Sequence, residues 1–235
     1  GTPHLTLETG DTDAVVDFAS GSGSAALTFN YTVTSGNVSS DLDYFSISAL
    51  AFNNGTIVDA DGNSADLTLA STGGANSLGA NKALVIDGVA PTVISVSSIA
   101  TDSTYMIGDS IAITVTFSEA VTVTGTPQLT LETGDTDAVA YYDSSVSTAT
   151  TLGFNYTVAG GHTNSDLDYA SISSLALNSG TINDAVGNAA TLTLASPGSI
   201  NSLGANKALV IDGVAPTVTA VTAATADGSY NAGEI

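Results

Sequence analysis

The residues in this sequence whose types and spacing suit chemistry are acidic and amide side chains in short turn motifs. Most of these motifs occur twice at a constant offset of 125 residues, as Asp-Leu-Asp-Tyr does at Tyr44 and again at Tyr169. Carboxylate and amide oxygens are the ligands that Ca²⁺ prefers, about six to eight at a time and in flexible geometry. The candidate metal ligands are Asp41, Asp43, Asp59, Asn63, Asp87, Glu119, Asp166, Asp168, Asp184, Asn188 and Asp212.

The side chains needed for most kinds of catalysis are missing. The chain has two histidines and no cysteine, and its two basic residues are lysines, so it has no arginine. His4 and His162 each lack a counterpart in the other copy of the repeat, where Gln128 stands in place of His4. Asp41 and Asp43 could form an acid and base pair, but they lie on a turn without a recognisable substrate groove. The sequence therefore predicts a protein that is not an enzyme.

A repeated stretch divides the chain into units. Residues 76–93 and 201–218 both read NSLGANKALVIDGVAPTV. A period of this length is the size of one β-sandwich domain and too long for a solenoid repeat. We predict a partial repeat over residues 1–89 that lacks its first strands, a complete repeat over residues 90–213, and the first strands of a following repeat over residues 214–235. We therefore expect the chain to be a piece of a tandem array.

Alternation of apolar and polar residues predicts β-strands along the whole chain. It is clearest over residues 27–33 and 152–158, where every second side chain is apolar. Residues 93–99 and 111–117 alternate in a similar way, and no segment shows a helical period with caps. The sequence predicts an all-β protein of tandem immunoglobulin-like β-sandwich domains, with about seven strands in each.

This topology predicts where the acidic motifs meet. In such a sandwich the turns carrying Glu119 and Asp184 to Asn188 lie at the end where the chain enters, beside the linker that carries Asp87. The turn with Asp41 and Asp43 lies at the exit end of the preceding unit, so we expect four acidic elements at one junction. Carboxylates held close together repel one another unless a cation is present. We predict Ca²⁺ there, since Mg²⁺ demands tighter octahedral geometry and no ligand set for zinc or copper is available.

Structural roles without a metal stand beside this interpretation. The segments around Asp87 and Asp59 are also typical of turns that their own side chains stabilise. Tyr44 or Tyr169 could form a tyrosine corner capped by the preceding aspartate, and Glu119 could be a solvated loop charge. The sequence leaves these alternatives open.

Composition limits the partners. The formal net charge is −21 with only two basic residues, Lys82 and Lys207, so nucleic acid and anionic membranes are excluded as partners. No apolar run approaches the length of a bilayer span, so we predict no membrane insertion. With 43% hydrophobic residues the chain has enough apolar side chains to fold. The absence of cysteine and the scarcity of basic residues favour secretion.

Four motifs together suggest a family. Thr-Phe-Ser-Glu-Ala-Val ending at Val121, Asp-Leu-Asp-Tyr at Tyr169, the turn ending at Asn188 and Val-Ile-Asp-Gly-Val-Ala-Pro ending at Pro216 resemble the bacterial immunoglobulin-like repeats of large Gram-negative surface and secreted adhesins. The resemblance covers the whole chain. It implies a sandwich fold, a secreted or bacterial cell-surface location, a spacer role and calcium at domain junctions.

Three functions follow as hypotheses. The first is a structural extender of an extracellular adhesin or surface fibre, stiffened by Ca²⁺ at its junctions, with a host or surface ligand bound elsewhere in the parent protein. The second is a subunit of a self-assembling filament or sheath, in which the tail of an identical chain completes the partial repeat head to tail. The third is a glycan- or protein-binding module that uses the divergent segments at residues 16–25 and 141–150.

Overall fold

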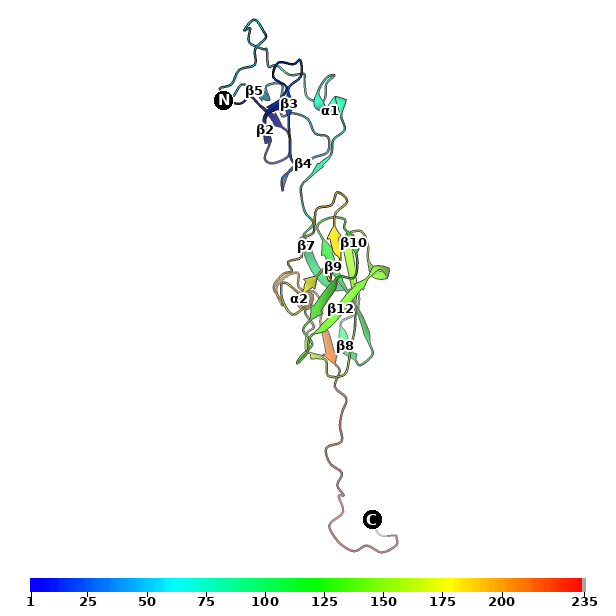
Figure 1. The fold of residues 1–235 in the computed structure, drawn as a ribbon. Helices are drawn as coiled ribbons and strands as arrows, with labels where there is room; N and C mark the ends of the chain where they lie inside the picture. The colour runs from blue at the N-terminus through cyan, green and yellow to red at the C-terminus, as the bar shows by residue number, and fades with distance from the viewer. Residues whose placement is uncertain (234–235) are drawn as a thin grey trace. The chain divides into compact units, whose positions relative to one another are not determined.

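The computed structural model describes residues 1–233, and its regular secondary structure is almost entirely β-strand, as predicted (Figure 1). The described chain divides into two compact units. Unit 1 comprises residues 1–92, 117–125 and 180–192, and unit 2 comprises the rest. The repeat boundaries at residues 89 and 213 stay a prediction from the sequence.

Unit 1 consists of short strands. They are β1 (His4–Leu7), β2 (Ala14–Ser20), β3 (Thr28–Phe29), β4 (Val38–Ser39), β5 (Leu50–Ala51), β6 (Ile86–Asp87), β10 (Thr122–Thr124) and β16 (Thr181–Asn183). The order β3-β2-β1-β5 forms one antiparallel sheet, while β4 pairs with β6 and β10 with β16. The buried cluster on this sheet is small: Leu7, Val16, Leu42, Tyr44 and Ala49.

Unit 2 contains longer strands in two sheets. They are β7 (Val93–Ser98), β8 (Ser103–Met106), β9 (Ser110–Phe117, whose last residue falls in unit 1), β11 (Gln128–Leu131), β12 (Ala138–Asp143), β13 (Thr151–Thr157), β14 (Thr163–Asn164), β15 (Leu175–Ala176) and β17 (Leu209–Asp212). One sheet has six strands in the order β15-β11-β12-β13-β9-β7, and the other has three in the order β14-β17-β8. The pair of β17 with β8 is parallel, whereas β11 with β12, β11 with β15, β12 with β13, β13 with β9, and β14 with β17 are antiparallel.

The pairing of β9 with β13 forms the centre of the core of unit 2. The two strands pair without a break from Thr151 opposite Thr116 to Thr157 opposite Ser110. Alternate side chains on both strands are completely or almost completely buried, among them Ile111, Ile113 and Phe154. The alternating pattern in the sequence therefore reflects a sheet with one buried face.

The same pattern does not give the same strand in unit 1. We predicted a strand over residues 27–33, but β3 covers only Thr28–Phe29. Its counterpart β13 spans 7 residues because β9 provides a ladder of backbone partners along that whole length. The prediction was wrong because a second partner strand is missing: within residues 1–233, β3 pairs only with β2.

Two short helices lie in the repeated stretch, where we predicted no helix. These are α1 (Leu78–Asn81) and α2 (Leu203–Asn206), of 4 residues each. The hydroxyls of Ser77 and Ser202 cap them by accepting a hydrogen bond from the third helical residue. A single turn is too short to show a helical period. Neither helix, nor any other in residues 1–233, is long and apolar enough to cross a membrane.

Candidate metal centre

Three of the predicted ligands come together in unit 1. Asp87 ends β6, Glu119 follows β9, and Asp184 follows β16. One carboxylate oxygen of each lies within 4.8 Å of those of the other two. Asp184 is buried and the other two side chains are half-buried. Within residues 1–233 this is the one group of three or more acidic, histidine or cysteine side chains that is close enough to hold an ion.

Asp184 is held in place by its own loop. Its Oδ1 accepts hydrogen bonds from the backbone N–H groups of Val186, Gly187 and Asn188 at 3.0, 2.7 and 2.8 Å. Its Oδ2 accepts a further bond, at 2.6 Å, from the Asn188 side chain. Burial alone would raise the pKa of Asp184, but these bonds outweigh it and hold the pKa below its ordinary value. The carboxylate is therefore charged and fixed before any cation arrives.

Asn188 also fixes the segment that carries Asp87. The same amide nitrogen donates to the backbone oxygens of Asp87 at 3.0 Å and Val89 at 3.3 Å. We predicted Asn188 as a ligand through its oxygen, whereas the hydrogen bonds of the structure use its nitrogen. Asn188 thus ties the chain at Asp87 to the loop of Asp184 without a metal.

The residue before Glu119 is anchored in a similar way. The backbone N–H of Ser118 donates to the Thr92 oxygen at 2.8 Å, and the Ser118 hydroxyl accepts from the Thr92 N–H at 2.9 Å. Sequence reasoning named Glu119 but assigned no role to Ser118 or Thr92. A hydroxyl beside a conspicuous acidic residue was the only signal available. These two bonds set where the Glu119 backbone lies.

The three carboxylates repel one another. Burial first, and then the negative charges of Asp87 and Asp184, raise the pKa of Glu119 above its ordinary value. The cluster therefore favours either a proton on Glu119 or a cation among the three groups. Oxygen ligands in this number leave room for backbone oxygens and water, an arrangement that suits Ca²⁺.

Asp41 and Asp43 do not belong to this cluster, which corrects our expectation that four acidic elements meet. Asp43 instead accepts hydrogen bonds from the N–H groups of Gly73 at 2.9 Å, Leu78 at 3.1 Å and Tyr44 at 2.9 Å. Burial opposes these bonds, yet together with bonds from Ser77 and Gly79 they hold the pKa of Asp43 below its ordinary value. The carboxylate is thus used to order the loop before α1.

Asp166 and Asp168 repeat this arrangement at α2. Asp168 is buried and accepts bonds from Gly198 N–H at 2.8 Å and Tyr169 N–H at 2.9 Å. A Cβ added to Gly204 would lie 3.0 Å from Asp168 Oδ2 and 3.6 Å from Asp166 Oδ2. Glycine in this turn therefore leaves space for both carboxylates, and neither belongs to the acidic cluster.

The tyrosines of the same motifs anchor the following loops. The Tyr44 hydroxyl donates to the Ala70 oxygen at 2.6 Å, and the Tyr169 hydroxyl donates to the Ala195 oxygen at 2.7 Å. These contacts match the tyrosine corner, the alternative to metal binding in which a buried tyrosine lies beside a capping aspartate. Burial and the neighbouring Asp168 charge raise the pKa of Tyr169 to about 12.

The remaining predicted ligands lie outside the cluster. Asp59 and Asn63 form the same loop as Asp184 and Asn188, with Asp59 accepting from Asn63 N–H and from its side chain, both at 2.8 Å. Asp59 is exposed and belongs to no acidic group of three. Asp212 is exposed, and its carboxylate accepts from Val214 N–H at 3.2 Å. The loop alone therefore does not make the cluster.

Removing the Asp168 carboxylate should destabilise unit 2. Asp168→Ala leaves the N–H groups of Gly198 and Tyr169 without their acceptor, at a cost of about 1–3 kcal/mol. Asp166→Ala is the matched control, because this exposed side chain should change the free energy of unfolding by less than about 0.5 kcal/mol. Urea unfolding of both variants measures the difference. If both variants lost the same free energy of unfolding, the buried hydrogen bonds of Asp168 would not be the source of the stabilisation.

Comparison with protein-family models, with curated proteins and with solved structures finds no match for this chain. The chemistry of the site therefore has to come from its own residues. Three carboxylates this close together can bind a hard cation and can hold a proton.

Proposed function

We propose that this chain supplies spacer repeats of a secreted or bacterial cell-surface adhesin or fibre, and that Ca²⁺ bound by Asp87, Glu119 and Asp184 stiffens the array. The observation that carries the proposal is the approach of their carboxylates to within 4.8 Å. Asp87 belongs to the first copy of the repeated sequence, whereas Glu119 and Asp184 belong to the next copy. An ion held by all three would link consecutive repeats.

The fold proposed for each repeat is an immunoglobulin-like β-sandwich. The six-stranded and three-stranded sheets of unit 2 support it, because buried side chains come from both sheets, such as Phe154 on β13 and Leu209 on β17. A stable sandwich with short connections suits a passive spacer. The acidic composition and the absence of cysteine are compatible with an extracellular location.

The cation would act on the linker between repeats. Asn188 and the Ser118 to Thr92 pair already restrict this segment, but three like charges oppose its closest approach. A divalent cation converts that repulsion into attraction and supplies bonds that a hinge motion would have to break. The expected result is a linker that bends in chelator and is stiff in calcium.

Small-angle X-ray scattering of the full chain with and without chelator tests this function. We expect the distribution of interatomic distances within the chain to be narrower in millimolar calcium and to broaden again when a chelator is added. Glu119→Gln is the control, because it keeps the side-chain shape and should show the chelator behaviour in both buffers. Identical scattering of the native chain in the two buffers would rule out a calcium-stiffened spacer.

Acidification should affect the native protein differently in chelator and in calcium. Because its pKa is raised in the folded form, the charged Glu119 destabilises folding at neutral pH, and this loss disappears as pH falls through that raised pKa. In chelator, the native protein should have a lower free energy of unfolding than Glu119→Gln at neutral pH. The difference between the two proteins should disappear by about pH 4. In calcium, the order at neutral pH should reverse.

Asp184 provides an internal check on this pH dependence. Its pKa is lowered, so its contribution to stability is present at neutral pH and is lost only as pH falls below its ordinary range. Glu119 and Asp184 therefore change the stability of the protein in separate pH ranges. Melting curves of the native protein and Glu119→Gln across the range measure both, and a gap that does not change with pH would contradict the coupling of the three charges.

A further inference from the structure

One face of unit 1 is an open apolar groove. The groove has a volume of about 600 Å³ and is lined by side chains including Leu5, Val16, Phe29, Leu78, Leu84 and Ile86. Leu84 is 41% exposed. On the neighbouring edge, β6 pairs only with β4 within the described residues. Both the apolar side chains and the strand edge are therefore available to a partner.

The equivalent surface of unit 2 is covered, and the structure shows by what. Leu209, the counterpart of Leu84, is completely buried. Strand β17 lies between β14 and β8, and β8 runs parallel to it from Ser103 opposite Leu209 to Met106 opposite Asp212. Strand β7 lies beside α2, where Val96 N–H donates to the Asn201 oxygen at 2.9 Å. Residues 93–106 thus complete this face.

The chain carries a second copy of that covering segment. Residues 216–233 follow residues 91–108 at the repeat offset of 125, with Val218, Val221 and Tyr230 in the places of Val93, Val96 and Tyr105. Every residue from 214 to 233 is exposed, and none lies in a strand or helix. Val221 is 93% exposed, whereas Val96 is 1% exposed. In Figure 1 this tail leaves the sheets of unit 2 as a single thread of backbone.

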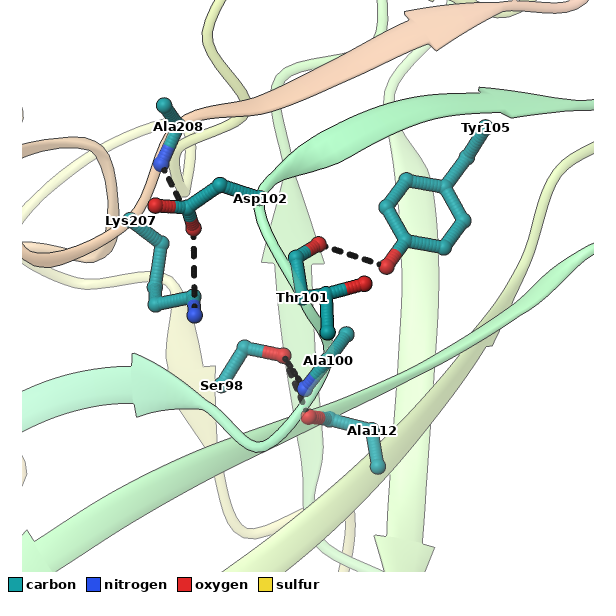
Figure 2. Close-up of polar contacts among 8 residues, drawn as sticks. All are labelled: Ser98, Ala100, Thr101, Asp102, Tyr105, Ala112, Lys207 and Ala208. Carbon is teal, nitrogen blue, oxygen red and sulfur yellow. Dashed lines mark hydrogen bonds and ion pairs between the residues drawn. The ribbon is translucent and has the colours of Figure 1, made fainter.

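Charge supports the same pairing. In unit 2, Lys207 Nζ lies 3.1 Å from Asp102 Oδ1, and that oxygen also accepts from Ala208 N–H at 3.2 Å (Figure 2). The counterparts of this ion pair are Lys82, beside the groove, and Asp227, in the tail. In unit 2 the lysine at this position contacts the covering segment, residues 93–106. Lys82 holds the same position in unit 1.

The tail already has one local feature of its docked counterpart. The Tyr105 hydroxyl donates to the Thr101 oxygen at 2.7 Å and closes the turn that precedes β8 (Figure 2). The Tyr230 hydroxyl donates to the Ala226 oxygen in the same way. The turn around Asp227 is thus formed before docking, which lowers the conformational entropy that docking has to fix.

We propose that the tail of one copy of this chain docks on the groove of a second copy by β-strand addition. Residues 228–231 of the tail lie parallel to residues 84–87 of the acceptor, as β8 does to β17. Val221 enters the groove beside α1, and Asp227 pairs with Lys82. Repetition of this contact would join copies head to tail, because residues 1–233 hold one such groove and one such tail.

Two variants test the tail and the groove separately. Val221→Asp places a charge in the groove and should weaken self-association about 30- to 100-fold, leaving a chain with a groove only. Leu84→Asp should do the same from the other side, leaving a chain with a tail only. Thr219→Asp is the control, because the counterpart of Thr219, Ile94, is 52% exposed in unit 2.

Sedimentation velocity on the two variants, alone and mixed, is the decisive test. We expect each variant to be monomeric alone and the mixture to form one-to-one dimers and nothing larger, whereas the native chain forms longer species as its concentration rises. Formation of the mixed dimer also shows that both variants are folded. A mixture that stays monomeric, or a native chain that does not associate, overturns the proposal.

The register can be tested by charge and by cross-linking. Lys82→Glu and Asp227→Lys should each weaken association about three- to tenfold, and their combination in one chain should restore it. The chain has no cysteine, so Val85→Cys and Ser229→Cys form a unique pair that should cross-link between copies, whereas Val85→Cys with Ala224→Cys should not. Equal cross-linking of both pairs would contradict the register.

This association should persist in chelator, because Lys82 and the apolar side chains of the groove lie outside the acidic cluster and only Asp87, at the end of the paired segment, belongs to it. Loss of association in chelator alone would assign it to the metal centre instead. Failure of the calcium-stiffened spacer and failure of the head-to-tail contact are therefore distinguishable in the same samples.

Discussion

Replacing Glu119 with glutamine should weaken calcium binding about 100-fold. The substitution keeps the shape of the side chain and removes one of three charges that lie within 4.8 Å of one another. Loss of a charged partner in a partly buried site costs about 2–4 kcal/mol, and each 1.4 kcal/mol is tenfold in affinity. Titration calorimetry with Ca²⁺ in buffer stripped of metal measures the change.

The duplicated loop supplies the control for this prediction. Asp184→Asn and Asp59→Asn change the same position of the same hydrogen-bonded loop, but only Asp184 lies in the cluster. We expect Asp184→Asn to weaken calcium binding about as much as Glu119→Gln and Asp59→Asn to leave it unchanged. If both loop variants lose affinity equally, the ion is not bound where the three carboxylates meet.

Replacing Phe154 with alanine should lower the free energy of unfolding of unit 2 by about 3–5 kcal/mol. Phe154 is fully buried between the ladder to β9 and the ring of Tyr142, whose centre lies 6.3 Å away. Its removal leaves a cavity in a strand pair that has no freedom to collapse. Denaturant unfolding measures the loss, and hydrogen exchange of the β13 amides assigns it to unit 2.

Phe29 is the matched control for Phe154. It occupies the same position in the repeat and meets Phe18 at the same ring separation of 6.3 Å, but it is only half-buried and has no β9 beside it. Phe29→Ala should therefore cost only about 1 kcal/mol. Similar losses for the two variants would mean that the groove of unit 1 is already filled.

Sequence periodicity predicted β7, β9 and β13, because successive side chains of a strand point to opposite faces of the sheet. Ser110–Phe117 and Thr151–Thr157 were found in this way. Periodicity cannot say whether a partner strand is present, which is why residues 27–33 were predicted as a full strand and only Thr28–Phe29 forms one. The single-turn helices were missed because their signal is a capping serine and not a period.

The divergent segments illustrate a different limit. Residues 16–25 and 141–150 differ between the copies, as a loop or an edge strand can. Residues 21–25 and 144–150 do lie outside the strands, but residues 16–20 and 141–143 belong to β2 and β12, which are inner strands of their sheets. Exposed side chains in these segments differ between the copies, as at Asp17 and Tyr141, but so do buried ones, as at Val16 and Ala140. The differences between the copies therefore follow neither exposure nor position in the sheet alone.

The acidic cluster was predictable in part. Topology placed Asp87, Glu119 and Asp184 at one end of a sandwich, and the structure brings these three together. The same reasoning misplaced Asp43, because a sequence does not show that nearby N–H groups, such as those of Gly73 and Leu78, already occupy its carboxylate. Which backbone N–H groups need a side-chain acceptor depends on the conformation of the loop. The spacing of acidic residues in the sequence does not reveal that conformation.

A crystal structure of the full chain grown with calcium, with anomalous scattering to identify the metal, tests the central claim most directly. The expected result is one anomalous peak about 2.3–2.6 Å from a carboxylate oxygen of each of Asp87, Glu119 and Asp184. A map with no peak there, and with these three side chains turned apart into solvent, would contradict the proposed calcium centre and the stiffening that depends on it.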